Sequence, residues 1–144
     1  MGALNRSLIS KAIKDIINEK TDGYLVIRNE KRNEDPSVAA NSKAWIGVYR
    51  SRISYSKFTI GPTPWLAAVE TDVEIQVASM KDGEDVEDKL QAAEKEIIEV
   101  LSANQTLNNT VSYIKEISVE DQTNINTETY FQASIITIKA EARI

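Results

Sequence analysis

The sequence predicts a single α+β domain over residues 1–144, with a mostly antiparallel sheet of four to five strands and two helices packed on one face. Three observations lead to this prediction. Residues 84–103 repeat apolar side chains at helical spacing, and residues 4–20 do the same. Short segments rich in β-branched residues lie on both sides of the second helix. Most of these segments are separated by short turns, which favours antiparallel pairing.

The N-terminal part is expected to supply one helix and two strands. The helix over residues 4–20 is followed by Gly23, which suits the left-handed turn that ends many helices. Tyr24–Arg28 is short, apolar and β-branched, so it is predicted to be a strand. Residues 29–42 are polar and aperiodic and are expected to form a loop, and a second strand is predicted at Ala44–Arg50.

The segment Arg52–Leu66 begins with strand-like alternation but then reaches two prolines. Pro62 and Pro64 exclude a central strand at that point, because proline cannot donate a hydrogen bond to a neighbouring strand. We therefore predict an extended arm, or a hairpin extension, that turns at residues 61–64. A clearly alternating strand is expected next, over Val69–Met80.

The C-terminal part is predicted to contribute the second helix and the last strands. Acidic residues in the first turn of the helix over residues 84–103 suit the positive end of the helix dipole. Strands are expected over Val111–Val119 and Thr129–Ala142. Polar turns at residues 104–110 and 120–127 precede these two strands.

Composition narrows the possible functions. The chain has no cysteine and no histidine, which removes thiolate nucleophiles, the commonest metal ligand and the usual general base near neutral pH. Five scattered glycines form no phosphate-binding loop. A net charge of −5 disfavours a general nucleic-acid binder. No apolar run approaches the ~18 residues that cross a bilayer. We therefore expect a protein of the reducing cytoplasm that is not an enzyme, holds no cofactor and contacts no membrane.

One acidic cluster has the spacing of a binding site. Glu70, Asp72 and Glu74 alternate along a predicted strand and therefore share one of its faces. Three carboxylates on one face are able to bind a divalent cation, and an enzyme with an oxygen-ligand metal site stays open as an alternative. A solvated strand face is favoured, because no oxygen-rich loop accompanies the cluster.

Charge is distributed unevenly along the chain. Residues 36–69 contain four basic and no acidic residues, whereas residues 70–103 contain eleven acids and three lysines. Aromatic residues with arginine are typical of interface centres, and opposite fields on one molecule suit head-to-tail contacts. The candidate interface residues are Arg50, Arg52, Tyr55, Lys57, Phe58 and Trp65. Two alternatives remain for the same window: a nucleic-acid-binding arm over residues 43–65, or simple core roles for Trp45 and Tyr49.

Several stretches carry a resemblance to a known family. They are the helix LISKAIKDIINEK, the strand AWIGVYR, the segment DVEIQV with the later helix and turn DKLQAAEKEIIEVLSANQTLNNTV, and the closing strand YFQASIITIKAEA. The order of a helix ending in leucine, a Leu-Asn-Asn turn and a valine-led strand is typical of that family. Over nearly its full length the chain resembles the tail terminator (tail completion) proteins of long-tailed bacteriophages and related phage-like particles. The arm at Arg52–Leu66 is longer than in the smallest members.

The resemblance implies a structural virion protein. Such proteins have no catalytic residues and form a hexameric ring at the head-proximal end of the tail. The ring contacts the tail tube protein, stops tube polymerisation and offers a surface to the head-tail connector, while DNA passes through as cargo. On this basis we expect the Arg50–Trp65 segment to contact the acidic strand or second helix of a neighbouring copy. We also expect Glu70, Asp72 or Glu74 to face the lumen, where acids would repel DNA. A head-side neck component remains an alternative function.

Overall fold

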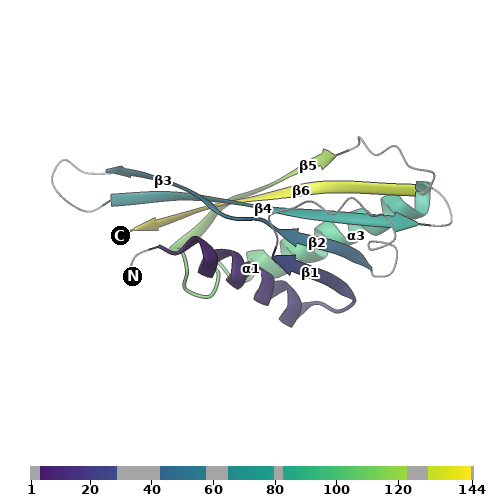
Figure 1. Cartoon of the computed structure of the whole chain (residues 1–144), viewed down its shortest axis with the longest axis horizontal. Helices are drawn as coiled ribbons and strands as arrows, with labels where there is room; N and C mark the ends of the chain where they lie inside the picture. The colour runs from purple at the N-terminus through teal and green to yellow at the C-terminus, as the bar shows by residue number, and fades with distance from the viewer. Residues whose placement is uncertain (1–3, 29–42, 58–64, 80–82, 123–129, 144) are drawn as a thin grey trace.

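The computed structural model shows two helices on one side of an open sheet (Figure 1). It describes residues 4–28, 43–57, 65–79, 83–122 and 130–143. The helices are α1 (Arg6–Lys20) and α3 (Gly83–Ser102). The strands are β1 (Tyr24–Arg28), β2 (Ala44–Val48), β3 (Arg52–Lys57), β4 (Trp65–Ser79), β5 (Tyr113–Gln122) and β6 (Tyr130–Arg143).

Strand β4 organises the sheet. The strand order is β1-β2-β4-β6-β5, and β3 pairs with the part of β4 that β2 leaves uncovered. The ladder between β4 and β6 runs from Leu66 opposite Arg143 to Ser79 opposite Tyr130. All neighbours are antiparallel except β1 and β2, which are parallel. In Figure 1, β3 and the first part of β4 reach beyond the helices at one end of the sheet.

The α+β class and the mostly antiparallel sheet are confirmed, and the expected four to five strands become six. The additional strand is β3, the part of the predicted arm that pairs with residues 65–70 of β4. The parallel pairing of β1 with β2 was also not anticipated. A parallel pair needs a crossover of about a dozen residues or more, and residues 29–43 are long enough to provide one.

Alternation along β4 creates two different faces of the sheet. Val69, Val73 and Ile75 are buried on the face that the helices cover. From α1, Ile13 and Ile17 join the same core, while α3 contributes Ile97, Leu101 and others. Burying each of these large aliphatic side chains stabilises the fold by about 1.5–3 kcal/mol. The apolar stripes predicted for both helices are therefore the stripes that face the sheet.

An unusual turn links α3 to β5. Leu107, Asn108 and Asn109 all have positive φ angles, of 47°, 57° and 66°. Leu107 is 1% exposed, so its side chain anchors the turn in the core. The Asn108 amide N–H donates to Asn104 Oδ1 (3.0 Å), and Asn104 Nδ2 donates to Asn108 Oδ1 (2.7 Å). Asparagine tolerates left-handed backbone well, which explains the two asparagines at this place.

Candidate interaction surfaces

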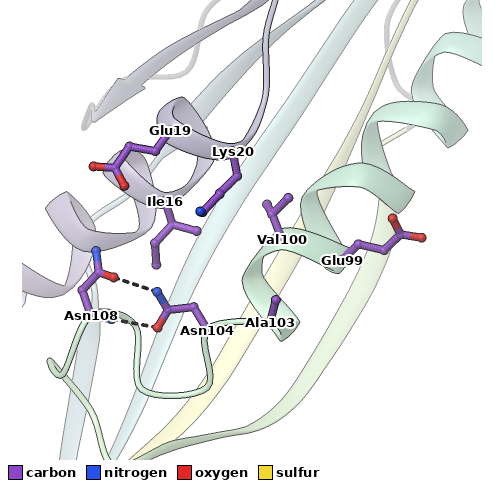
Figure 2. A pocket seen from close by; sticks show the side chains of 8 residues that line it. All are labelled: Ile16, Glu19, Lys20, Glu99, Val100, Ala103, Asn104 and Asn108. Atoms are coloured by element: carbon purple, nitrogen blue, oxygen red, sulfur yellow. Dashed lines mark hydrogen bonds between the residues drawn. The ribbon is translucent and has the colours of Figure 1, made fainter.

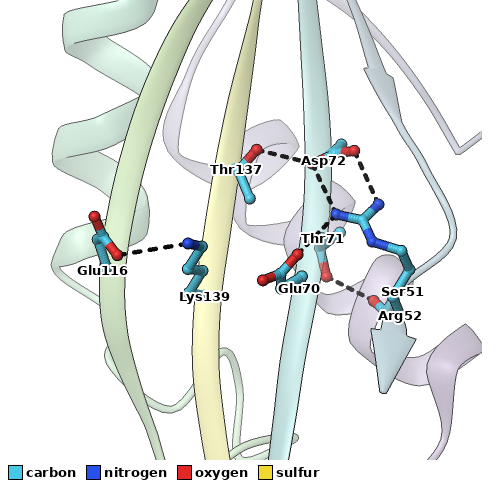
Figure 3. A network of polar contacts seen from close by, with 8 residues as sticks. All are labelled: Ser51, Arg52, Glu70, Thr71, Asp72, Glu116, Thr137 and Lys139. Atoms are coloured by element: carbon cyan, nitrogen blue, oxygen red, sulfur yellow. Dashed lines mark hydrogen bonds and ion pairs between the residues drawn. The ribbon is translucent and has the colours of Figure 1, made fainter. Parts of the chain in front are cut away.

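The face of the sheet opposite the helices carries an ion-paired cluster centred on Arg52 (Figure 3). Arg52 Nη1 donates to Asp72 Oδ2 at 2.9 Å, and Arg52 Nη2 donates to Glu70 Oε2 at 3.0 Å. From β6, Thr137 Oγ1 donates to Asp72 Oδ1 at 2.9 Å. The hydrogen bond to Asp72, followed by the one to Glu70, raises the pKa of Arg52. The cluster therefore ties β3, β4 and β6 together on one face.

A second group of charges continues this face onto β5. Lys139 Nζ lies 3.8 Å from Glu116 Oε2, and Lys115 Nζ lies 3.3 Å from Glu141 Oε1. The hydroxyl of Tyr113 donates to Glu141. This hydrogen bond is the main cause that lowers the pKa of Glu141 and raises the pKa of Tyr113. Because solvent screens these pairs, they define the character of the surface more than its stability.

The prediction that Glu70, Asp72 and Glu74 share one face is confirmed, but the solvated strand face that was favoured is wrong for Glu74. Its side chain is buried at 1% exposure, and it accepts a hydrogen bond of 2.6 Å from the Tyr49 hydroxyl. The physical reason lies in β2. Gly47 is directly opposite Glu74, and the ring of Trp45 lies across Gly47, so the indole covers this part of the face.

The core roles proposed for Trp45 and Tyr49 are supported in different ways. Trp45 is 2% exposed, and Tyr49 is partly buried with its hydroxyl on Glu74. A signal for this arrangement exists in the sequence: a glycine separates the two aromatic residues on one strand face. Gly47 leaves the space that the indole ring fills.

The candidate interface residues are placed unevenly. Arg50 is exposed between β2 and β3, and Tyr55 is 54% exposed on β3. Phe58 lies outside the described residues, as do the side chains of Lys57 and Trp65. Arg52 is brought together with Glu70 and Asp72 of its own chain. The basic window is therefore locally balanced at Arg52, which weakens the case for a nucleic-acid-binding arm.

A shallow groove of about 440 Å³ separates the C-terminal halves of α1 and α3 (Figure 2). Ile16, Glu19 and Lys20 of α1 line the groove together with Glu99 and Val100 of α3. The hydrogen-bonded pair Asn104 and Asn108 closes one end.

Within the described residues, no three acidic side chains converge as a set of metal ligands. Neither of the described helices combines the length and the hydropathy that a membrane crossing requires. Comparison with protein-family models gives no match, and a search of curated proteins gives none either. The interaction surfaces must therefore be interpreted from their own geometry.

Three strands have an unpaired side in the described part of the chain, and one of them is β1, which is paired only with β2. Strand β3 is paired only on its β4 side, and strand β5 only on its β6 side. An unpaired edge presents a row of backbone N–H and C=O groups that can pair with another strand. Each of these strands also carries an exposed large hydrophobic residue: Leu25 on β1 (40%), Tyr55 on β3 (54%) and Val119 on β5 (41%). These edges are the features best suited to contact another protein.

Proposed function

We propose that this protein is a structural virion component that assembles as a hexameric ring on the head-proximal end of a phage tail tube. In this role it ends tube polymerisation and presents a surface to the head-tail connector. The proposal takes its identity from the family resemblance of the sequence. The structural observation that supports it is the open sheet, in which the free edges of β3 and β5 lie on opposite sides of β4.

Two different edges on one molecule favour head-to-tail association. A contact that joins one surface to a different surface repeats from copy to copy, and it forms a closed ring when the rotation between copies allows. A ring needs no titratable catalytic group, which agrees with a chain that has no histidine and no cysteine. The partly exposed acids Glu70 and Asp72, which pair with Arg52, remain the candidates for the lumen, now without Glu74.

Mass determination by light scattering, followed by negative-stain imaging with and without purified tail tubes, tests this function. We expect rings of six copies at one end of each tube, and tubes that no longer lengthen when free tube protein is added. Decoration along the sides of tubes, or no association with tubes, would contradict the proposal. Rings that bind isolated connector but leave tubes free would instead indicate a neck component.

A further inference from the structure

Among the free edges of the sheet, those of β3 and β5 differ in charge. Strand β3 carries Arg52 and Lys57 and has no acid. Strand β5 carries Lys115 together with Glu116, Glu120 and Asp121. Pairing two copies of β3 would bring basic residues together, and pairing two copies of β5 antiparallel about Ser118 would place Glu116 opposite Glu120. Like charges opposite each other destabilise a strand pair, so the charges favour β3 against β5.

The accessible parts of the two edges are matched in length. The pairing of β1 with β2 ends at Val48, and β3 begins only at Arg52. Strand β1 therefore does not cover the outer edge of β3. On the other edge, β5 has an irregularity between Ile114 and Glu116 and is regular after it. A bulge at the start of an edge strand restricts pairing there. The regular part of β5 beyond Glu116 is thus left for a strand as short as β3.

The directions of the strands are compatible with a ring. Strands β3 and β6 both run antiparallel to β4, and β5 runs antiparallel to β6, so β5 runs opposite to β3. A rotation about an axis parallel to the strands preserves strand direction. The β5 strand of one copy therefore meets the β3 strand of the next copy in antiparallel orientation.

The faces of the sheet then determine the alignment. Opposite residues in a ladder point to the same face, so Arg52 and Ser54 share the helix-free face with Ser118 and Glu120. In a sheet that continues from one copy to the next, residues opposite each other across the contact must also point to the same face. Placing Arg52 opposite Glu120 satisfies the match and pairs opposite charges. In this alignment Ser54 lies opposite Ser118.

The same alignment pairs the apolar residues on the helix side. Ile53 then lies opposite Val119, and Tyr55 lies opposite Ile117 and diagonal to Val119. Tyr55 and Val119 are 54% and 41% exposed in the single chain, and this contact would cover both. Cross-strand pairs of aromatic and β-branched residues are among those that stabilise sheets. This alignment thus pairs Arg52 with Glu120, serine with serine and the apolar residues with one another. It places Lys57 opposite Lys115, where the β5 ladder is irregular.

We propose that β3 of one copy adds to β5 of the next copy as an antiparallel strand pair, with Arg52 opposite the next copy's Glu120. This inference identifies the contact between copies in the proposed ring. It rests on the proposed function in one respect, which is that the chain assembles head to tail. The partner of the β3 edge is therefore β5 of another copy of this chain, and the partner of the β5 edge is β3 of another copy. Backbone hydrogen bonds supply the contact, and the side chains at residues 52–55 set its alignment.

Cysteine cross-linking in the cysteine-free chain tests the alignment directly. Opposite residues in an antiparallel pair have Cα atoms roughly 4.5–5.5 Å apart, within the range that a disulfide bridges. The double variant Ser54→Cys, Ser118→Cys should give a ladder of covalent multimers ending in a closed ring under mild oxidation. Ser54→Cys mixed with Ser118→Cys should give covalent dimers only, and each variant alone should give none.

Three results would overturn the inference. Covalent dimers from Ser54→Cys alone would show that β3 pairs with another β3. Stronger cross-linking of the pair Ser56→Cys, Ser118→Cys, which is diagonal in the proposed alignment, would show a different register. Absence of any ladder at high protein concentration would show that these edges do not meet, since oxidation also traps transient contacts.

If no ladder forms but six-membered rings still cap tubes, the proposed function stands without this contact. A ladder without capping would leave the contact and remove the function.

Discussion

Among single residues, Tyr24 makes the clearest link between two elements. Its hydroxyl donates to Glu96 Oε2 at 2.8 Å, which connects β1 to α3, and Lys43 Nζ lies 5.2 Å from the ring centre. Tyr24→Phe removes the hydrogen bond and keeps the ring. We expect the free energy of unfolding at neutral pH to fall by about 1 kcal/mol, measured by urea titration. Tyr55→Phe is the matched control, because the Tyr55 hydroxyl makes no hydrogen bond within the described chain and should change nothing.

The same tyrosine predicts a difference at alkaline pH. Burial is the main cause that raises the pKa of Tyr24, and the hydrogen bond to Glu96 adds to it. Above pH 10 the unfolded chain loses this proton while the folded chain keeps it, so folded protein binds more protons and stability falls as pH rises. The advantage of the natural chain over Tyr24→Phe should therefore shrink as pH rises above about 10. A constant difference between the two unfolding curves from pH 8 to pH 11 would contradict this expectation.

Gly47 is required by the ring that covers it. A Cβ atom added there would lie 2.4 Å from one carbon of the Trp45 ring and 2.7 Å from another. Gly47→Ala should therefore destabilise the protein by about 1–3 kcal/mol, as overpacking does. In a Trp45→Leu background the same substitution should cost much less, because the clashing ring is gone. Equal costs in the two backgrounds, measured as a double-mutant cycle, would refute this explanation of the glycine.

Among the elements, the turn after α3 depends on residues that accept left-handed backbone. Asn109 is exposed, has a φ of 66°, and has a weak side-chain contact of 3.4 Å from the Thr106 hydroxyl. Asn109→Ala should cost about 1 kcal/mol, because alanine is strained at positive φ, whereas Asn109→Gly should be close to neutral. Thermal unfolding of the two variants checks the order. Greater stability for alanine than for glycine would show that the turn rearranges.

Sequence periodicity predicted the helices and strands that bury one face. It did not predict features that depend on how two strands pair. Both helices and β1 lie where their patterns place them. Strand β4 begins at Trp65 rather than Val69, because pairing with β3 and β6 extends it through Leu66–Ala68, which has no alternation. The direction of β1 relative to β2 depends on the path of the chain between them, which local patterns do not encode.

The candidate surface shows the same division. Alternation correctly placed Glu70, Asp72 and Glu74 on one face of β4. The burial of Glu74 depends on which residue of β2 lies beside it, and that register sets Gly47 and the Trp45 ring at this position. The partner of Arg52 is likewise set by the β3–β4 register, which places it opposite Glu70. Properties of one strand were readable from the sequence, whereas properties of a strand pair required the structure.

For the whole molecule, the open sheet makes assembly depend on its edges more than on its helices. Val119 on β5 and Leu25 on β1 have almost equal exposure, 41% and 40%, and both lie on edge strands. Only Val119 belongs to the proposed contact between copies. Val119→Asp would bury a charge beside Ile53 and Tyr55 of the copy whose β3 pairs with this β5, at a cost that far exceeds that of an exposed substitution.

We therefore expect Val119→Asp to reduce the mass measured by light scattering to that of smaller species, while its urea unfolding midpoint at low protein concentration changes little. Leu25→Asp should retain the assembled mass, since its aspartate stays in solvent. The comparison separates an edge-specific contact from a general effect of adding charge to an acidic protein. If both variants dissociate equally, the ring depends on overall charge repulsion. If only Leu25→Asp dissociates, the contact lies on the β1 side of the sheet and not on β5.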